Sequence, residues 1–188
     1  ELAKAVHRET EGNPFFLSEM IRHLAESGYI VQRDGQWVSD YTLDQVGIPE
    51  GIREVVGRRL SALSSTVNAA LSIACAIGPE FDVATIEAAG GPSGDDLCDA
   101  LDDAVRASVV REVAGSYGRY AFAHALVRST LYDELSTTRR VRLHWKVGEA
   151  LAARHGAEEQ YVDQLAHHFA EGAMAGDPMV ALEWCVKA

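Results

Sequence analysis

The stretch Tyr120-Ala-Phe-Ala-His-Ala-Leu-Val-Arg-Ser-Thr-Leu-Tyr-Asp133 contains the change of pattern on which the fold of this chain depends. Its first residues have the composition of a short strand, and the later ones follow helical spacing. The pattern predicts a strand that leads directly into a helix, with His124 at the junction. A histidine at such a corner points out of the fold, so we treat His124 as a candidate contact residue.

Residues 48–123, upstream of the junction, carry the element order of a winged helix-turn-helix domain. Apolar spacing and breaker residues predict a helix after Pro49, one that ends at Gly78-Pro79, a short one over 81–89 and one over 95–107. The β-rich segments 109–113 and 119–122 flank a glycine-containing turn and are expected to pair as a hairpin. Helices followed by a hairpin are typical of a winged helix.

The first 47 residues are expected to hold two helices and a β-hairpin. Gly12-Asn13-Pro14 interrupts the helical pattern, and Pro14 suits the first turn of the second helix. Asp34-Gly35 lies between two β-rich runs and is a strong signal for a two-residue hairpin turn. Residues 40–49 are expected to form a loop.

From His124 onward the pattern is helical throughout. Two apolar stripes, with alanine at close-packing positions, resemble the start of a helical (TPR-like) repeat array. Their residues are Val141, His144, Trp145, Gly148, Leu151 and Ala152, and then Val162, Leu165, Ala166, Phe169 and Ala173. The predicted fold is therefore mainly α, with helices and a β-hairpin over 1–47, a winged helix-turn-helix domain over 48–123, and a helical linker and repeats over 124–188.

The composition is that of an ordinary globular protein, since 47% of the 188 residues are hydrophobic and the mean hydropathy is −0.07. The apolar runs are too short to span a bilayer, and the N-terminus has no signal-peptide pattern. We therefore expect a cytoplasmic protein with no membrane partner. Because the chain begins at Glu1 and ends within a helical pattern, we expect it to be an excerpt of a longer protein.

No metal site is predicted. The cysteines Cys75, Cys98 and Cys185 are far apart in sequence and lie in apolar helical patterns, so we expect reduced core thiols rather than disulfides or zinc ligands. His167 and His168 are adjacent on a helix, which directs their side chains about 100° apart and disfavours a shared ion.

The sequence also lacks the motifs of a catalytic site. A P-loop needs a glycine-rich loop followed by Lys and Ser or Thr, and the glycine-rich segment 90–94 has no such lysine. The Gly-x-Ser-x-Gly nucleophile elbow is absent too. We expect the chain itself to be non-catalytic.

The charge distribution argues against direct DNA binding by the winged helix. The net charge is −11, and the helix that would enter the groove carries five aspartates and only Arg106 as a cation. Arg139, Arg140, Arg142 and Lys146 form a basic cluster, which is a candidate interaction patch for nucleic acid or an acidic partner. The alternative is a charged helix start whose cations pair with nearby acidic side chains.

Taken in order, these motifs resemble the region after the nucleotide-binding core of STAND-type (AAA-like) signal-transduction ATPases. The similarity is to the large bacterial group of ATP-binding LuxR-type transcription regulators and adenylate-cyclase-linked ATPases, and it covers nearly the whole chain. The matching segments are Thr10-Glu-Gly-Asn-Pro-Phe-Phe-Leu-Ser-Glu19, Ile48-Pro-Glu-Gly-Ile-Arg-Glu-Val-Val56, Arg59-Leu-Ser-Ala-Leu63, Phe122-Ala-His-Ala-Leu-Val-Arg128, Leu135-Ser136, Arg139-Arg140, Leu143-His144 and Leu165-Ala-His-His-Phe169.

The resemblance implies a regulatory role without catalysis in this segment. Residues 1–47 would be the lid end of the ATPase module, in which Gly12 and Asn13 shape a turn and Pro14 approaches the adenine ring. His124 would contact the β-phosphate of ADP, although Ala125 stands where an aspartate is common in that motif. The parent chain would be an ATPase that holds ADP or ATP with Mg through an upstream nucleotide-binding domain, and this segment would hold no cofactor. An inducer or protein partner would bind the helical repeats.

Two other functions stay open on the residues alone. A winged-helix regulator would bind DNA through the patch at 139–146. A plain protein-interaction module would use His124 only as a packed structural residue.

Overall fold

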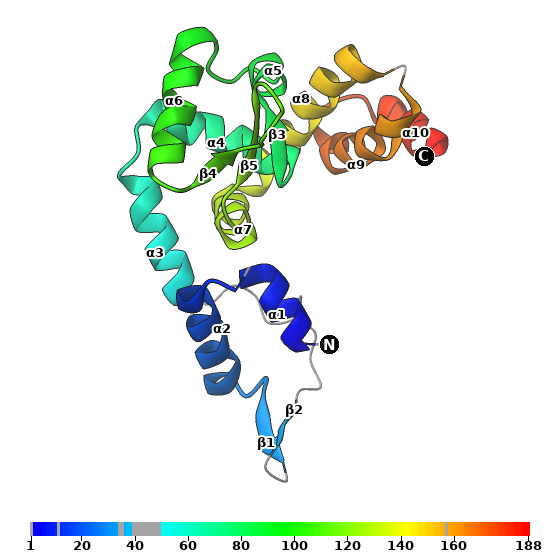
Figure 1. Ribbon diagram of the computed structural model, residues 1–188. Helices are drawn as coiled ribbons and strands as arrows, with labels where there is room; N and C mark the ends of the chain where they lie inside the picture. Colours follow the sequence, from blue (N-terminus) through cyan, green and yellow to red (C-terminus); the bar gives the residue numbers. More distant parts are fainter. Residues whose placement is uncertain (1, 11, 34–35, 39–49, 157) are drawn as a thin grey trace. The chain divides into compact units, whose positions relative to one another are not determined.

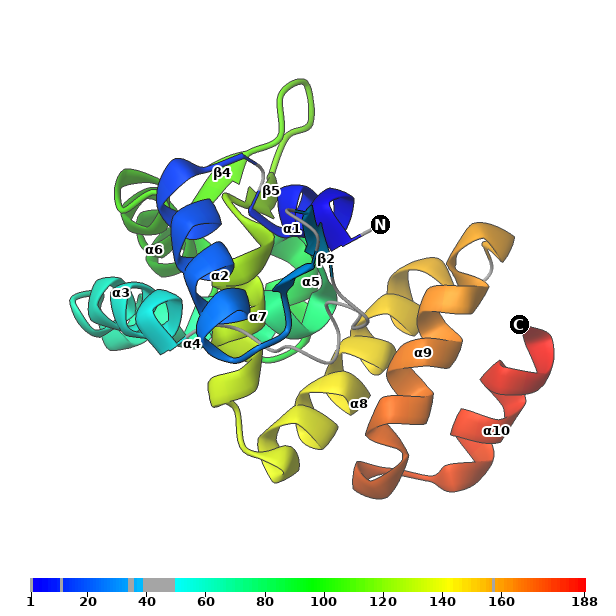
Figure 2. The same cartoon turned by 90° about the horizontal axis from the view of Figure 1, so that it is seen from below.

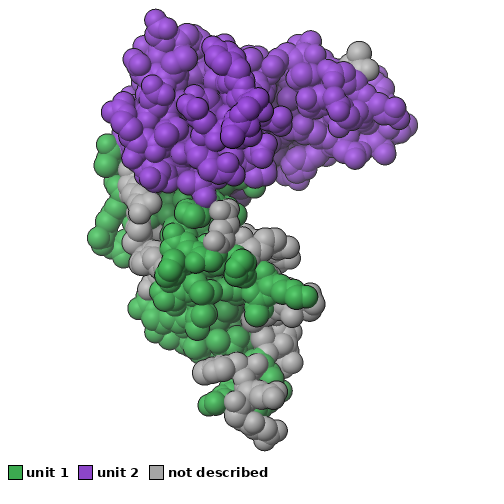
Figure 3. All heavy atoms as spheres, in the orientation of Figure 1, with its two compact units in different colours: residues 1–62, 124–130 green, residues 63–123, 131–188 purple. Residues whose placement is uncertain are grey.

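The computed structural model describes residues 2–10, 12–33, 36–38, 50–156 and 158–188. These residues form a mainly helical fold with a two-stranded and a three-stranded antiparallel sheet (Figure 1). None of their helices is both long and apolar enough to cross a bilayer. Two compact units are present, one made of Glu1–Ala62 and His124–Thr130 and the other of Leu63–Ala123 and Leu131–Ala188 (Figure 3). The three-part division at 47/48 and 123/124 stays a prediction.

The first unit contains the two predicted helices and the predicted hairpin. Its elements are α1 (Leu2–Thr10), α2 (Pro14–Glu26), β1 (Val31–Arg33), β2 (Gln36–Val38) and α3 (Glu50–Ser61). The strands β1 and β2 pair antiparallel, with Val31 opposite Val38, so the hairpin is confirmed. Its turn at Asp34-Gly35 and the loop expected over 40–49 lie outside the described residues.

One face of α2 supplies much of the core of this unit. Phe16, Met20 and Leu24 recur every fourth residue and are almost fully buried, as an amphipathic helix requires. The start of α7 (Ala125–Glu134) belongs to the same unit, and its Leu126 and Val127 are buried as well. A segment distant in sequence therefore belongs to this unit.

The second unit begins with helices around a small sheet. Its first elements are α4 (Ser65–Ile77), β3 (Glu80–Asp82), α5 (Val83–Ala88), α6 (Gly94–Arg106), β4 (Val110–Glu112) and β5 (Arg119–Phe122). The strand order is β3-β5-β4, all antiparallel. The predicted hairpin of β4 and β5 is confirmed. The helix expected over 81–89 is wrong at its start, because Phe81 pairs with Tyr120 in the sheet and the helix begins only after Asp82.

Asp82 caps α5 and also ties it to α8 (Thr137–His155). Its carboxylate accepts hydrogen bonds from the Thr85 amide (2.9 Å), the Thr85 hydroxyl (2.8 Å) and the Arg154 guanidinium (2.7 Å). Burial raises the pKa of Asp82, but these hydrogen bonds and the Arg154 charge outweigh it and leave the pKa below its ordinary value. This cluster joins parts of the second unit that are 72 residues apart in sequence.

The cysteines are only partly as expected. All three are free of disulfides, and Cys75 is buried in α4, but Cys98 and Cys185 are exposed. The core-thiol prediction is therefore wrong for these two. Helical spacing alone does not distinguish the buried edge of an apolar stripe from its solvent-facing neighbour.

The last helices lie side by side in the second unit (Figure 2). Helix α8 packs against α9 (Val162–Gly172), and α9 packs against α10 (Pro178–Lys187). Short 3-10 turns, Glu159–Tyr161 and Ala173–Ala175, border α9. The predicted stripe of α8 was too narrow, since Leu143, Val147 and Ala150 are also buried. The reason is that α8 is covered by α4 and α5 as well as by α9.

Candidate functional sites

The turn at Gly12-Asn13-Pro14 joins α1 to α2 in the first unit. The Asn13 amide donates to the Thr10 carbonyl (2.8 Å), and the Asn13 carbonyl accepts from the Leu17 amide (2.9 Å), which begins α2. Pro14 is the first helical residue, where its missing N–H removes no hydrogen bond. Gly12 has a φ of +73°, a conformation that favours glycine. Gly12 and Pro14 are exposed, so the turn offers an accessible surface.

His124 lies between β5 and α7, as the sequence predicts. Its carbonyl accepts from the Val127 amide (3.1 Å), so the residue caps the start of α7. The half-buried ring meets the ring of Phe16 edge to face, with centroids 5.3 Å apart. Phe16 is two residues past Pro14 on α2. The first unit therefore brings His124 next to the helix that the Gly12-Asn13-Pro14 turn begins.

The basic cluster predicted at 139–146 divides into two parts. The Arg140 guanidinium donates to the carbonyls of Leu135 (3.0 Å) and Asp133 (2.9 Å) and lies 4.7 Å from the centroid of the Tyr132 ring. Arg140 therefore fixes the end of α7 to the start of α8. Its role is structural, and it does not belong to the pocket that the other three cations line.

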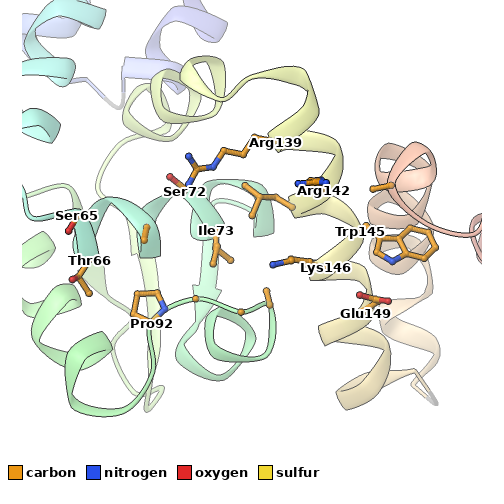
Figure 4. Close-up of a pocket in the computed structure, with 16 residues that line it drawn as sticks. Ser65, Thr66, Ser72, Ile73, Pro92, Arg139, Arg142, Trp145, Lys146 and Glu149 are labelled. Carbon is orange, nitrogen blue, oxygen red and sulfur yellow. The ribbon is translucent and has the colours of Figure 1, made fainter.

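Arg139, Arg142 and Lys146 line a pocket of about 770 Å³ in the second unit. The pocket lies between α4, the 89–92 segment and α8. In Figure 4, Arg139 extends toward Ser72, and Lys146 extends toward the loop that holds Pro92. The first two residues of α4, Ser65 and Thr66, and the carboxylate of Glu149 line it too. We call this the α4–α8 pocket.

These three cations differ from most arginines of the second unit. Arg106 pairs with Asp103, Arg119 with Glu80 and Arg154 with Asp82. Among the residues that the structure describes, the side chains of Arg139, Arg142 and Lys146 have no acidic partner and no hydrogen bond. In a chain with 28 acidic and 17 basic residues, three uncompensated cations in one cavity are unexpected for a merely solvated helix face.

A histidine cluster lies between α8 and α9. The Nδ1 atoms of His144 and His168 are 3.0 Å apart, and His144 Nε2 is 2.8 Å from the Tyr132 hydroxyl. His144 and His168 are buried and His167 is exposed. One nitrogen from each of the three rings lies within 4.8 Å of the others. Helical spacing disfavours a shared ion for His167 and His168 alone, but the His144 ring, from α8, lies 5.4 Å from the His167 ring and 5.1 Å from the His168 ring between centroids.

The exposed face of α6 is acidic. Asp95, Asp96, Asp99 and Asp102 are all exposed, and Arg106 is neutralised by its ion pair with Asp103. Such a surface repels a phosphate backbone. The charge argument made from the sequence is thus matched by the exposure of these side chains.

The sequence predicts the cations of the α4–α8 pocket but not the lining from α4 and the 89–92 segment. It does not predict the histidine cluster. The available signal for the cluster was helical spacing, since His144 lies on the predicted stripe of α8, and His167 and His168 adjoin Leu165, Ala166 and Phe169 of the α9 stripe.

The chain matches no known family model, no curated protein and no solved structure.

Proposed function

We propose that the chain is the non-catalytic regulatory part of a STAND-type ATPase of the LuxR-type or cyclase-linked group. It would couple the nucleotide state of an upstream domain to the binding of an inducer or partner. The observation that carries this proposal is that the Gly12-Asn13-Pro14 turn and His124, about 110 residues apart, belong to one compact unit with His124 against Phe16.

The proposal requires one hydrogen bond from His124 and one apolar contact at Pro14. An imidazole donates a hydrogen bond to a phosphate oxygen, and its protonated form adds a charge. His124, held by Phe16 and by the start of α7, is suited to this contact, and the exposed turn at Pro14 is suited to an apolar contact with adenine. ADP would supply the phosphate that His124 binds. A nucleotide shifts such a switch only through its different affinity for the two states.

The element order of the second unit supports a winged helix. The order of elements is α4-β3-α5-α6-β4-β5 and the sheet order is β3-β5-β4, which is the order expected if this part is a winged helix-turn-helix. In this proposal the domain serves protein interaction and not base readout, because α6 presents aspartates where a recognition helix presents cations and amides. Fold alone does not decide between these roles.

Helices α8, α9 and α10 support the start of a repeat array. Each packs on the next, and α10 carries Met179, Leu182 and Val186 exposed at helical spacing. Repeat proteins bury such stripes by stacking a further helix pair. We place the binding of an inducer or protein partner on this array.

The test is nucleotide retention by the full parent chain. We expect ADP to co-purify with the wild type and to dissociate faster from His124→Ala. The loss of one hydrogen bond to a charged group, about 1.5–3 kcal/mol, corresponds to roughly 10–150-fold. His155→Ala, which removes another half-buried histidine from the second unit, is the matched control and should retain ADP. Equal retention in both variants would refute the sensor role, and absence of nucleotide from the wild type would favour the plain interaction module.

The DNA-binding alternative makes the opposite prediction for the isolated chain. Duplex binding that weakens steeply with salt and is lost in Arg139→Gln would support it. We expect no such binding, because Arg140 is engaged with α7 and the cations at 139, 142 and 146 line a concave pocket that also holds Glu149.

A further inference from the structure

The first observation concerns charge in the α4–α8 pocket. Arg139, Arg142 and Lys146 contribute three positive charges at neutral pH, and Glu149 contributes one negative charge. The lining therefore has a net charge of about +2 by these ordinary ionisation states. A ligand of charge −2 would neutralise it, and a phosphate monoester is the common small molecule of that charge.

The second observation concerns hydrogen-bond donors. Ser65 and Thr66 are the first residues of α4, where backbone N–H groups lack intrahelical acceptors. The Ser64 hydroxyl accepts from the Val67 amide (3.2 Å), so this cap satisfies the Val67 amide and not those of Ser65 and Thr66. These donors and the two side-chain hydroxyls line the same pocket as the cations, and both kinds of group favour an anion.

The third observation concerns size and apolar lining. A cavity of about 770 Å³ lies within the range of ligand sites, about 300–1,000 Å³. Ile73, Leu143 and Pro92 supply apolar surface. The loop at Gly91 packs tightly against α4 and α5. A Cβ added to Gly91 would lie 2.9 Å from Ile73 Cδ1 and 2.6 Å from Ile86 Cγ2. A bare anion would leave most of this space empty.

We propose that the α4–α8 pocket binds a small phosphate monoester whose organic part is apolar or aromatic. Arg139, Arg142 and Lys146 bind the phosphate, and the apolar lining contacts the organic part. This site is separate from the His124 constellation and does not depend on the proposed nucleotide switch.

Calorimetry with the 188-residue chain tests this proposal, with phenyl phosphate as the probe. Inorganic phosphate and phenol supply the two halves of the probe separately, and each should bind at least tenfold more weakly. Arg139→Gln combined with Lys146→Gln should weaken phenyl phosphate binding at least tenfold. Glu149→Gln should strengthen it severalfold, because it removes the one negative charge of the lining. Arg111→Gln, which changes an exposed arginine outside the pocket, should have no effect.

Two results would overturn the proposal. One is the absence of binding by phenyl phosphate at millimolar concentration in low salt. The other is binding that Arg111→Gln weakens as much as the double substitution does, since that would reflect general charge attraction. Partial unfolding cannot raise the affinity for phenyl phosphate. The Glu149→Gln variant therefore still tests the proposal if the double variant is unstable.

The histidine cluster carries a second, independent inference. Two nitrogens bound to a tetrahedral zinc ion at 2.0–2.1 Å are about 3.4 Å apart, close to the 3.0 Å between the Nδ1 atoms of His144 and His168. The nitrogen of exposed His167 lies within 4.8 Å of the other two, so metal binding requires a shift of this side chain toward them. Tyr132 holds His144 Nε2 at 2.8 Å, as outer partners of metal-binding histidines do.

We infer that His144, His167 and His168 bind a divalent transition metal such as Zn²⁺ through three imidazole nitrogens, with the fourth position left to water or a partner. Neutral imidazole is the ligand type that suits Zn²⁺, Ni²⁺ and Co²⁺. Binding through both Nδ1 atoms requires each to present a lone pair, so the proton that lies between the two neutral rings moves to an Nε2 atom.

Metal binding is measured on the chain without a histidine tag, by calorimetry with Zn²⁺ and by visible absorption with Co²⁺. Because His167 is exposed, His167→Ala should retain the fold and bind Zn²⁺ at least tenfold more weakly. Tyr132→Phe should weaken binding about 10–100-fold, and His155→Ala should not. Equal affinity of wild type and His167→Ala, or no binding of Zn²⁺ at tens of micromolar, would overturn the inference.

Discussion

The clearest stability prediction concerns Asp82, whose carboxylate accepts two hydrogen bonds from Thr85 and one from Arg154. In Asp82→Ala the cap of α5 is lost, which costs about 1 kcal/mol, with a range of about 0.5–2. The ion pair with Arg154 is about one-third exposed at each end, so its loss adds only about 0.2–1 kcal/mol. We therefore expect the free energy of unfolding of the second unit to fall by roughly 1–3 kcal/mol.

A second variant separates the cap from the charge. Asparagine caps helices about as well as aspartate, so Asp82→Asn should lose only the charge contribution. Urea unfolding followed by circular dichroism measures both variants. Asp102→Asn, an exposed aspartate of α6, is the control and should change stability by less than about 0.5 kcal/mol.

The pH dependence follows from the direction of the pKa shift. The pKa of Asp82 is lower in the folded state than in the unfolded chain, so its ionised form stabilises the fold above the unfolded value of about 3.9. That stabilisation is lost as the pH falls through the lower, folded pKa. The difference between wild type and Asp82→Asn should be constant from about pH 7 to 5 and shrink below about pH 4. Equal losses in Asp82→Ala and Asp82→Asn, or a difference that grows on acidification, would refute this reasoning.

Three further stability predictions are checked by urea unfolding. Phe16→Ala should lower the free energy of unfolding of the first unit by about 3–5 kcal/mol, because Phe16 is buried. Ile21→Ala, on the exposed side of the same helix, should change it little. Equal losses in the two variants would contradict the burial of Phe16. Gly91→Ala should lower the free energy of unfolding of the second unit by about 1–3 kcal/mol, because the added Cβ would overlap Ile86. An unchanged urea midpoint of unfolding would show that the loop shifts to accept the Cβ. Tyr132→Phe should cost about 1–3 kcal/mol, since it removes the hydroxyl that lies 2.8 Å from buried His144; a neutral result would mean that this contact adds no stability.

Local signals predicted many elements. The break at Gly12-Asn13-Pro14 and the hairpin around residues 34–35 follow from turn chemistry. The start of α10 is equally local, because Asp177 caps it through the Met179 amide (2.9 Å) and Pro178 is its first residue. Each of these features depends on a few neighbouring residues, so the sequence is sufficient to predict it.

The features that were missed depend on packing between distant segments. β3 has three residues, too few to show alternation, and forms because β5 lies beside it. Arg139 and Arg140 are adjacent in sequence, yet one lines the α4–α8 pocket and the other fixes α7, which helical spacing could not distinguish. The histidine cluster exists because α8 and α9 are neighbours, and helix pairing was expected without its register.

The discontinuity of the first unit has a consequence for synthesis on the ribosome. Residues 1–62 share their core with His124–Thr130, whose Leu126 and Val127 are buried. At about 5–20 residues per second, the intervening sixty or so residues take roughly 3–12 s to make. During that delay Phe16 lacks the His124 ring that lies against it in the folded unit, so the nascent chain exposes this apolar residue of α2 to chaperones.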